Sequence, residues 1–203
     1  MTLSANTAST DTMYCIFLGR AIQSTVPSTN SITPAMLGDT TVTALSAGTG
    51  ITGGTGTVYR SAVEKLGNIY HTKILIDLTG LASSGSGDII GKAATANCHI
   101  GQITAAVNGT VLSGKMTCME APAGGDPDIN LWYADEATGT EDAAITGLSN
   151  QTQMCDSGDL ALGSVISIPT PPAADKYMYM VTGAATDANY TAGKILKEFF
   201  GYV

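Results

Sequence analysis

The alternation of hydrophobic and polar positions in residues 99–120 predicts a β-hairpin. Two runs of strand-forming residues flank Asn108-Gly109, a pair that tolerates the positive φ of a type I′ turn. Pairing outward from this turn gives one mostly apolar face and one face with a polar centre, as in an antiparallel sheet that lies on a core. The apolar face pairs Val107 with Thr110, Ala105 with Leu112, Ile103 with Gly114 and Gly101 with Met116; the other pairs Ala106 with Val111, Thr104 with Ser113 and Gln102 with Lys115.

Two strand patterns precede this hairpin. Residues 57–63 and 69–78 are joined by Gly67-Asn68, and the apolar run at 74–78 predicts a strand that is buried on both faces near its end. Residues 64–66 could instead form one helical turn that Gly67 ends, but the strand is favoured. Residues 88–91 predict another short strand.

After the hairpin, short apolar runs alternate with turn residues. Residues 129–133 and 165–168 predict brief strands, the second at a sheet edge because prolines follow it. Residues 134–153 are acidic and small, which is typical of an exposed loop. Residues 192–203 fit either an amphipathic helix or a final strand, and the sequence leaves this choice open. Residues 177–181 alternate Tyr and Met, which places Tyr177, Tyr179 and Val181 on one side and Met178 and Met180 on the other.

Short strands separated by turns predict an all-β fold, with an antiparallel β-sandwich or jelly-roll-like domain at residues 57–203. Residues 1–56 form a Ser, Thr and Gly-rich segment whose charged side chains are Asp11, Arg20 and Asp39. A segment so poor in charge and in large apolar groups does not easily form its own core. We therefore expect an extended N-terminal arm that gains order by packing on the domain or on a neighbouring chain.

Composition and charge exclude several classes of function. Only 13% of the 203 residues are charged, and the net charge is -8, so electrostatic binding to nucleic acid is not expected. The amino terminus lacks the basic leader and apolar core of an export signal. No apolar run reaches the roughly 18 residues of a membrane span. We expect a soluble protein made in a cytoplasm, without a nucleic-acid or membrane partner.

The cysteines and one glycine motif give little support to an enzyme. Cys15, Cys98, Cys118 and Cys155 are widely spaced and form no C-x-x-C pair, which favours buried free thiols over disulfides or metal ligands. Residues 48–53 match the dinucleotide pattern G-x-G-x-x-G. However, Gly54 and Gly56 would break the helix that this pattern needs, so a flexible linker is the better interpretation.

Two further groups of residues are candidate sites. Asp126 and Asp128 could contribute to a calcium site, but the regular D-x-D-x-D-G pattern is absent and a solvated turn is favoured. In the predicted hairpin, His99 lies opposite Cys118, which would place a base beside a nucleophile. No orienting acid or further ligand accompanies this pair. We therefore expect no catalytic, cofactor-binding or metal-binding residues and no enzyme activity.

Several phrases of the chain resemble a family of proteins encoded by marine tailed bacteriophages, including cyanophages. The resemblance runs from about residue 48 to the carboxyl end and is carried by G-T-V-Y at 56–59, K-I-L-I-D-L-T-G-L at 73–81, G-D-I-I-G at 87–91, H-I-G-Q-I-T at 99–104 and A-G-G-D-P-D-I at 123–129. It implies a virion structural protein, specifically a capsid decoration or cement protein. The implied partner is the major capsid protein and the implied location is the capsid surface. A homotrimer is expected by analogy with such subunits.

A binding module is the alternative class. A tail- or fibre-associated β-sandwich that recognises host glycans would need an aromatic platform, and Trp132-Tyr133 beside the acidic loop is the candidate. The competing interpretation of this pair is core packing.

Overall fold

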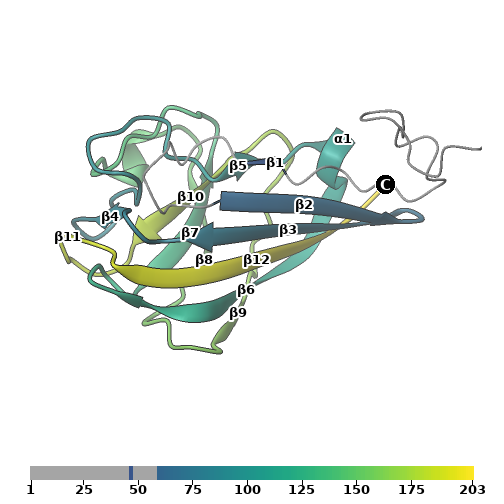
Figure 1. Cartoon of the computed structure of the whole chain (residues 1–203). Helices are drawn as coiled ribbons and strands as arrows, with labels where there is room; N and C mark the ends of the chain where they lie inside the picture. The colour runs from purple at the N-terminus through teal and green to yellow at the C-terminus, as the bar shows by residue number, and fades with distance from the viewer. Residues whose placement is uncertain (1–45, 48–58) are drawn as a thin grey trace, which may run out of the picture.

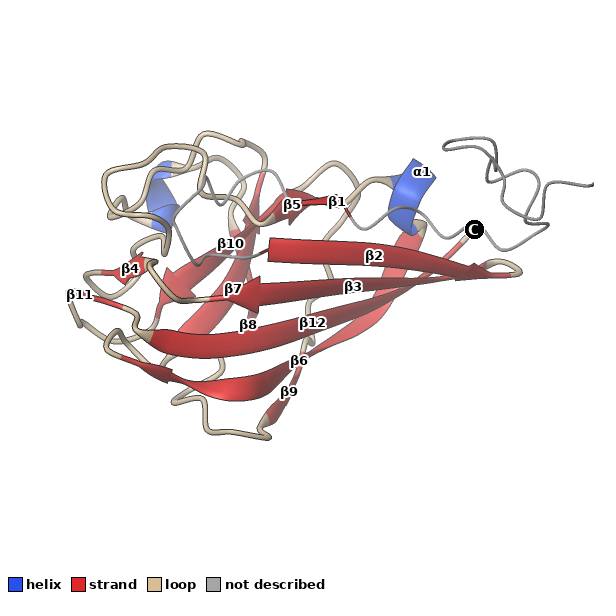
Figure 2. Cartoon of the chain, in the orientation of Figure 1, coloured by secondary structure: helices blue, strands red, loops and turns tan. Residues whose placement is uncertain are grey.

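The structure, a computed structural model, describes residues 46–47 and 59–203. Its strands form a six-stranded antiparallel sheet in the order β1-β2-β3-β12-β6-β9, a four-stranded sheet in the order β5-β10-β7-β8, and a small pair, β11-β4 (Figures 1 and 2). This confirms the predicted all-β, antiparallel, sandwich-like fold. The strands are β1 (Ser46–Ala47), β2 (Tyr59–Leu66), β3 (Ile69–Asp77), β4 (Ala82–Ser83), β5 (Gly101–Gln102), β6 (Thr110–Ala123), β7 (Ile129–Ala134), β8 (Thr152–Cys155), β9 (Val165–Ser167), β10 (Tyr177–Thr182), β11 (Ala188–Asn189) and β12 (Ala192–Tyr202).

The helices within the described ranges are short: α1 (Ala105–Asn108) and the 3₁₀ turn η2 (Ile145–Gly147). Neither is long and apolar enough to cross a membrane. The predicted N-terminal arm lies outside the described residues except for β1, which pairs with Arg60 and Ser61 at one edge of the six-stranded sheet.

The strands predicted at residues 57–63 and 69–78 form as β2 and β3, apart from residues 57 and 58, which lie outside the described residues. β2 continues to Leu66 and pairs antiparallel with β3, so the helical turn considered for residues 64–66 does not form. Gly67 in the connecting turn has φ +59°, a value that glycine adopts without strain. The expected burial of β3 on both faces is wrong, because Ile74 and Ile76 face the core whereas Leu75 between them is 37% exposed.

The predicted hairpin of residues 99–120 is wrong. β5 pairs with β10, whereas β6 pairs with β12 and β9. Asn108 ends α1 and is buried: its Oδ1 accepts the Thr104 N–H at 2.9 Å, and its Nδ2 donates to Thr72 Oγ1 at 2.9 Å. Asn108-Gly109 therefore ends a short helix, and the Asn108 side chain is hydrogen-bonded to β3. β5 and β6 pair with strands far away in the sequence and not with each other.

The carboxyl-terminal segment is the strand β12, which settles the choice between helix and strand. It lies between β3 and β6 in the centre of the six-stranded sheet. Ile195 and Phe199 point into the core that this sheet shares with Leu131 and Met178 of the four-stranded sheet. The two sheets therefore pack face to face.

β10 divides its side chains between two clusters, as the Tyr and Met alternation predicts. Met178 and Met180 belong to the core between the sheets. Tyr179 and Val181 belong to a second cluster with Ile89 and Ile145, which come from loops on the other side of the four-stranded sheet. The loop at residues 134–153 is therefore partly buried, contrary to expectation, because Ile145 anchors it.

Of three other predicted strands, two form and the third does not. β7 and β9 form where expected, and β9 is an edge strand as the following prolines indicate. Residues 88–91 make only isolated bridges, among them Ile89 with Val181.

Lys197 lies on the inner face of β12, where Ile74 of β3 and Met116 of β6 are its cross-strand neighbours. The residue is fully buried, and its amine has no hydrogen-bond partner among the described residues. Burial holds the pKa of Lys197 well below its usual value, while the nearby Cys155 acts in the opposite direction. A buried amine without a partner destabilises a fold.

Replacing Lys197 with Met is expected to stabilise the fold, because methionine has a similar volume and no amine to desolvate. The expected gain in the free energy of unfolding at pH 7 is roughly 1–4 kcal/mol. The pKa of Lys197 is lower in the folded than in the unfolded chain, so wild-type stability rises as pH increases toward the unfolded value of about 10.4. Urea unfolding of wild type and Lys197→Met at pH 7 and pH 10 tests this prediction. The difference in the free energy of unfolding between the two proteins should be smaller at pH 10.

Lys194→Met is the control for this measurement. Lys194 is on the same strand but on the outer face, where it pairs with Glu120, and its loss should change stability by less than about 1 kcal/mol. Equal stability of wild type and Lys197→Met at pH 7 would contradict the expected cost of the buried amine.

Candidate interaction surface

The outer face of the six-stranded sheet is the side away from the core. Its side chains form rows across β2, β3, β12 and β6, because the antiparallel register aligns one residue of each strand. The row nearest the β2–β3 turn contains Leu66, Ile69, Tyr202 and Thr110; the next contains Glu64, His71, Phe200 and Ser113; the third contains Ala62, Lys73, Glu198 and Lys115.

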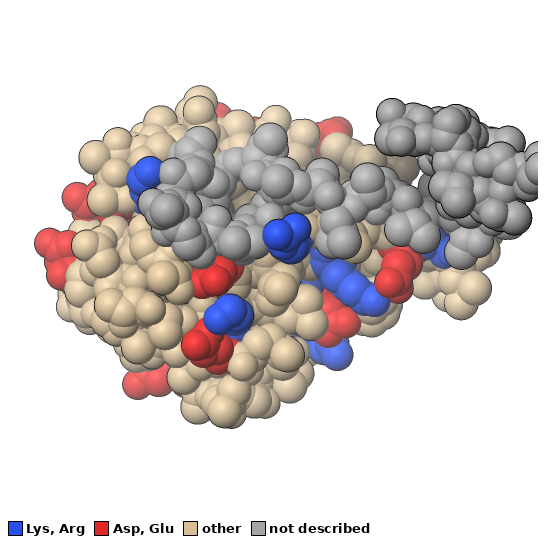
Figure 3. Space-filling model, in the orientation of Figure 1, with Lys and Arg blue, Asp and Glu red and all other residues tan. Residues whose placement is uncertain are grey.

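The second and third rows hold a network of ion pairs, the charged network, made by Glu64, His71, Lys73, Lys115 and Glu198. Lys73 Nζ donates to Glu64 Oε1 at 2.9 Å and Oε2 at 3.0 Å. Glu198 Oε1 lies 3.0 Å from His71 Nε2, and Glu198 Oε2 lies 3.0 Å from Lys115 Nζ. Figure 3 shows basic beside acidic side chains across this face. The network is internally neutralised, so it does not present a patch of one charge.

Glu198 is the centre of this network and its side chain is only 12% exposed. Burial by itself raises the pKa of Glu198, but the hydrogen bonds and charges of Lys115 and His71 outweigh burial and hold the pKa below its usual value. The His71 ring also stacks on Phe200, with centroids 4.4 Å apart. The charged network therefore borders directly on aromatic surface.

An apolar patch covers the end of this face next to the β2–β3 turn. We define the patch as five side chains from four neighbouring strands, and a register shift in β6 opposite Phe200 and Gly201 accommodates the extra residue Leu112. Soluble monomers seldom expose contiguous apolar patches larger than a few hundred Å², and large exposed patches are typical of interaction sites. The side chains and exposed fractions are Leu66 80%, Ile69 50%, Leu112 65%, Phe200 37% and Tyr202 53%.

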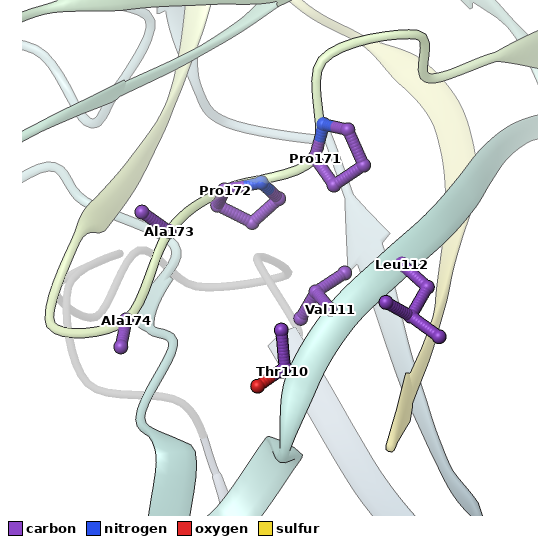
Figure 4. Close-up of a pocket in the computed structure, with 7 residues that line it drawn as sticks. All are labelled: Thr110, Val111, Leu112, Pro171, Pro172, Ala173 and Ala174. Carbon is purple, nitrogen blue, oxygen red and sulfur yellow. The ribbon is translucent and has the colours of Figure 1, made fainter.

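Two pockets flank the patch. The first, the tip pocket, has a volume of about 410 Å³ and is lined by Glu64, Lys65, Leu66, Ile69, His71 and Phe200. The second also has a volume of about 410 Å³ and lies where the loop at residues 171–174 faces the start of β6. Figure 4 shows the Pro171 and Pro172 rings across this second pocket from Thr110 and Val111. Both pockets are open hollows that could receive side chains of another protein surface.

The structure does not bring His99 and Cys118 together. His99 packs edge-on against Tyr177 of β10, with centroids 5.0 Å apart, whereas Cys118 is in β6 opposite Ile195. Burial lowers the pKa of His99 and raises the pKa of Cys118, so His99 is neutral at pH 7. Cys98, Cys118 and Cys155 are free and buried as predicted, and Cys15 lies outside the described residues.

Asp126 organises the turn before β7 and is not solvated, contrary to expectation. It is 1% exposed. Its Oδ1 accepts the Asp128 N–H at 3.0 Å, and its Oδ2 accepts the Ala184 N–H at 2.8 Å. Burial, followed by the charges of Asp156, Asp126 and Asp159, raises the pKa of Asp128. Within the described ranges, no group of three or more His, Cys, Asp or Glu side chains is arranged to hold a metal ion.

Trp132 and Tyr133 do not form an open platform. Both are half-buried in β7. Trp132 packs against the cluster that contains Tyr179 and Ile145, and its indole N–H is buried with no hydrogen-bond partner in the described part of the chain. This packing favours a core role for Trp132. The glycine motif at residues 48–53 lies outside the described residues.

Sequence reasoning missed the apolar patch because it is made by separate strands. Leu66 and Ile69 flank one turn, whereas Phe200 and Tyr202 come from the far end of the chain. One local signal was present in the sequence. In each strand these apolar residues alternate in step with Glu64 or Glu198, which predicts that they lie on the solvent-facing side of the sheet.

Replacing Glu198 with Gln is expected to lower the free energy of unfolding at pH 7 by about 0.5–1.5 kcal/mol, because His71 and Lys115 lose a charged acceptor. The pKa of Glu198 is lower in the folded chain, so its contribution is present above the unfolded pKa of about 4.3 and is lost as pH falls through the folded pKa. Thermal unfolding of both proteins at pH 7 and pH 3 measures this, and their stabilities should converge at the lower pH. An equal difference in stability between the two proteins at pH 7 and pH 3 would argue against an electrostatic role of Glu198.

Comparisons with protein family models, with curated proteins and with solved structures found no match to this chain.

Proposed function

We propose that this chain is a virion structural protein that decorates a bacteriophage head and stabilises it, with the major capsid protein as its partner. The observation that carries the proposal is the apolar patch of Leu66, Ile69, Leu112, Phe200 and Tyr202, exposed on one end of a rigid sheet. Such a surface is costly in water and suits a subunit that is buried in an assembly. The resemblance of the sequence to a family of phage proteins is the reason for proposing that this assembly is a phage head.

The rest of the described surface is compatible with a cement role. The charged network is neutralised within the subunit, so binding depends on shape and apolar contact more than on ionic strength. The two sheets enclose one shared core, and a packed two-sheet body of this kind suits a subunit that bridges capsid subunits. Nothing in this role requires catalysis.

The test uses full-length protein and phage heads purified without it. Addition of the protein is expected to give saturable binding that is spread evenly over the head, and to raise the temperature at which the heads release DNA. Survival in low-salt buffer should rise in parallel. Labelled protein confined to the tail would favour the glycan-binding alternative, and equal heat survival of heads with and without the protein would count against a cement role.

A further inference from the structure

Lys197 places a reactive group inside the core. Its amine is fully buried and has no hydrogen-bond partner in the described part of the chain. The side chain starts on the inner face of β12, between Ile74 and Met116, which both belong to the core that the two sheets share. Packed sheets lie about 10 Å apart, and a lysine side chain is long enough to cross much of that gap. The amine of Lys197 is therefore directed toward the four-stranded sheet.

Cys155 of β8 is the thiol on that opposite sheet, and it belongs to the same core. The Thr170 N–H, just after β9, donates to the Met154 carbonyl at 3.3 Å, so β8 lies over the side of the six-stranded sheet that contains β6 and β9. β12 is next to β6 in that sheet. Burial raises the pKa of Cys155 and lowers the pKa of Lys197, and each group opposes the shift of the other. The amine and the thiol are therefore neighbours across the core.

Burial also sets the reactivity of the two groups. It disfavours the ammonium form of Lys197, and a desolvated lysine with a free lone pair is a nucleophile. β8 is an edge strand of the four-stranded sheet. Cys155 is 4% exposed, and the exposed Asp156 follows it. Local opening at this edge admits a molecule as small as hydrogen peroxide, so Cys155 can be oxidised beside a nucleophilic amine.

We propose that hydrogen peroxide joins Cys155 and Lys197 in a sulfenamide crosslink between the two sheets. The Cys155 sulfur first attacks peroxide: an S–O bond forms, the O–O bond breaks, and the thiol becomes a sulfenic acid with release of one water. The lone pair of the Lys197 amine then attacks this sulfur. An S–N bond forms, and the hydroxyl group leaves with an amine proton as a second water. The sulfur loses two electrons and the peroxide gains them.

The test treats folded, full-length protein with hydrogen peroxide and identifies linked peptides by mass spectrometry. Trypsin and a glutamate-specific protease separate Cys118 from Cys155, because Glu120 and Glu136 lie between them. Wild type is expected to give a peptide pair that joins Cys155 to Lys197. The pair should be lighter than the sum of the two peptides by two hydrogen atoms, and dithiothreitol should separate it.

The crosslink is also expected to raise thermal stability. A covalent link between distant strands acts as a disulfide does, so the melting temperature of peroxide-treated wild type should rise by about 5 °C or more. Dithiothreitol should reverse this rise. The treated Lys197→Met variant should show no reversible rise, because its Cys155 has no amine to capture the oxidised sulfur.

Cys118→Ser is the matched control. Cys118 is also a buried thiol of the core, but its Sγ donates to the Glu120 carbonyl at 3.3 Å, so its loss should leave the linked pair in place. Lys197→Met and Cys155→Ser should both abolish the pair, and circular dichroism establishes that each variant is folded. Treated wild type without the pair, whether Cys155 stays a thiol or becomes a sulfinic acid, would overturn the proposal. A pair that contains Cys118 in place of Cys155 would do the same.

Discussion

The pairing of β12 with β3 and β6 is the constraint on which the rest of the structure depends. The last strand of the chain occupies the centre of the larger sheet and bonds along almost its whole length on both sides. Its inner residues Ile195 and Phe199 fill the core, and its outer residues Glu198, Phe200 and Tyr202 supply the middle of the exposed face. Because these contacts join distant parts of the sequence, the central pairings of the larger sheet are long-range ones.

This central strand also carries the least favourable feature of the core. Lys197 faces inward, and its amine has no hydrogen-bond partner within residues 46–47 and 59–203. The fold therefore tolerates a destabilising amine at a position that is apolar in both neighbouring strands. The remaining core compensates with Ile, Leu, Met and Phe side chains from both sheets. The outer face shows the opposite arrangement, because the side chains of the charged network are paired with one another and the neighbouring apolar side chains are left exposed.

The outer face of the six-stranded sheet leaves an apolar patch exposed beside the β2–β3 turn, next to charges that neutralise one another. Burial of such a patch in an assembly lowers its free energy, because apolar surface is removed from water. This patch is the basis of the proposed role on a phage head.

The sequence by itself determined the class of fold, the strands β2 and β3 and the two-sided character of β10, because each depends on local alternation of side chains. It did not determine the partner of β6, since Asn108-Gly109 carries the same signal whether it closes a hairpin or ends a helix. Nor did it show the apolar patch or the position of Lys197. Those features arise from register between strands far apart in the chain, and only the tertiary structure decides that register, because the core side chains of both sheets must interdigitate at once.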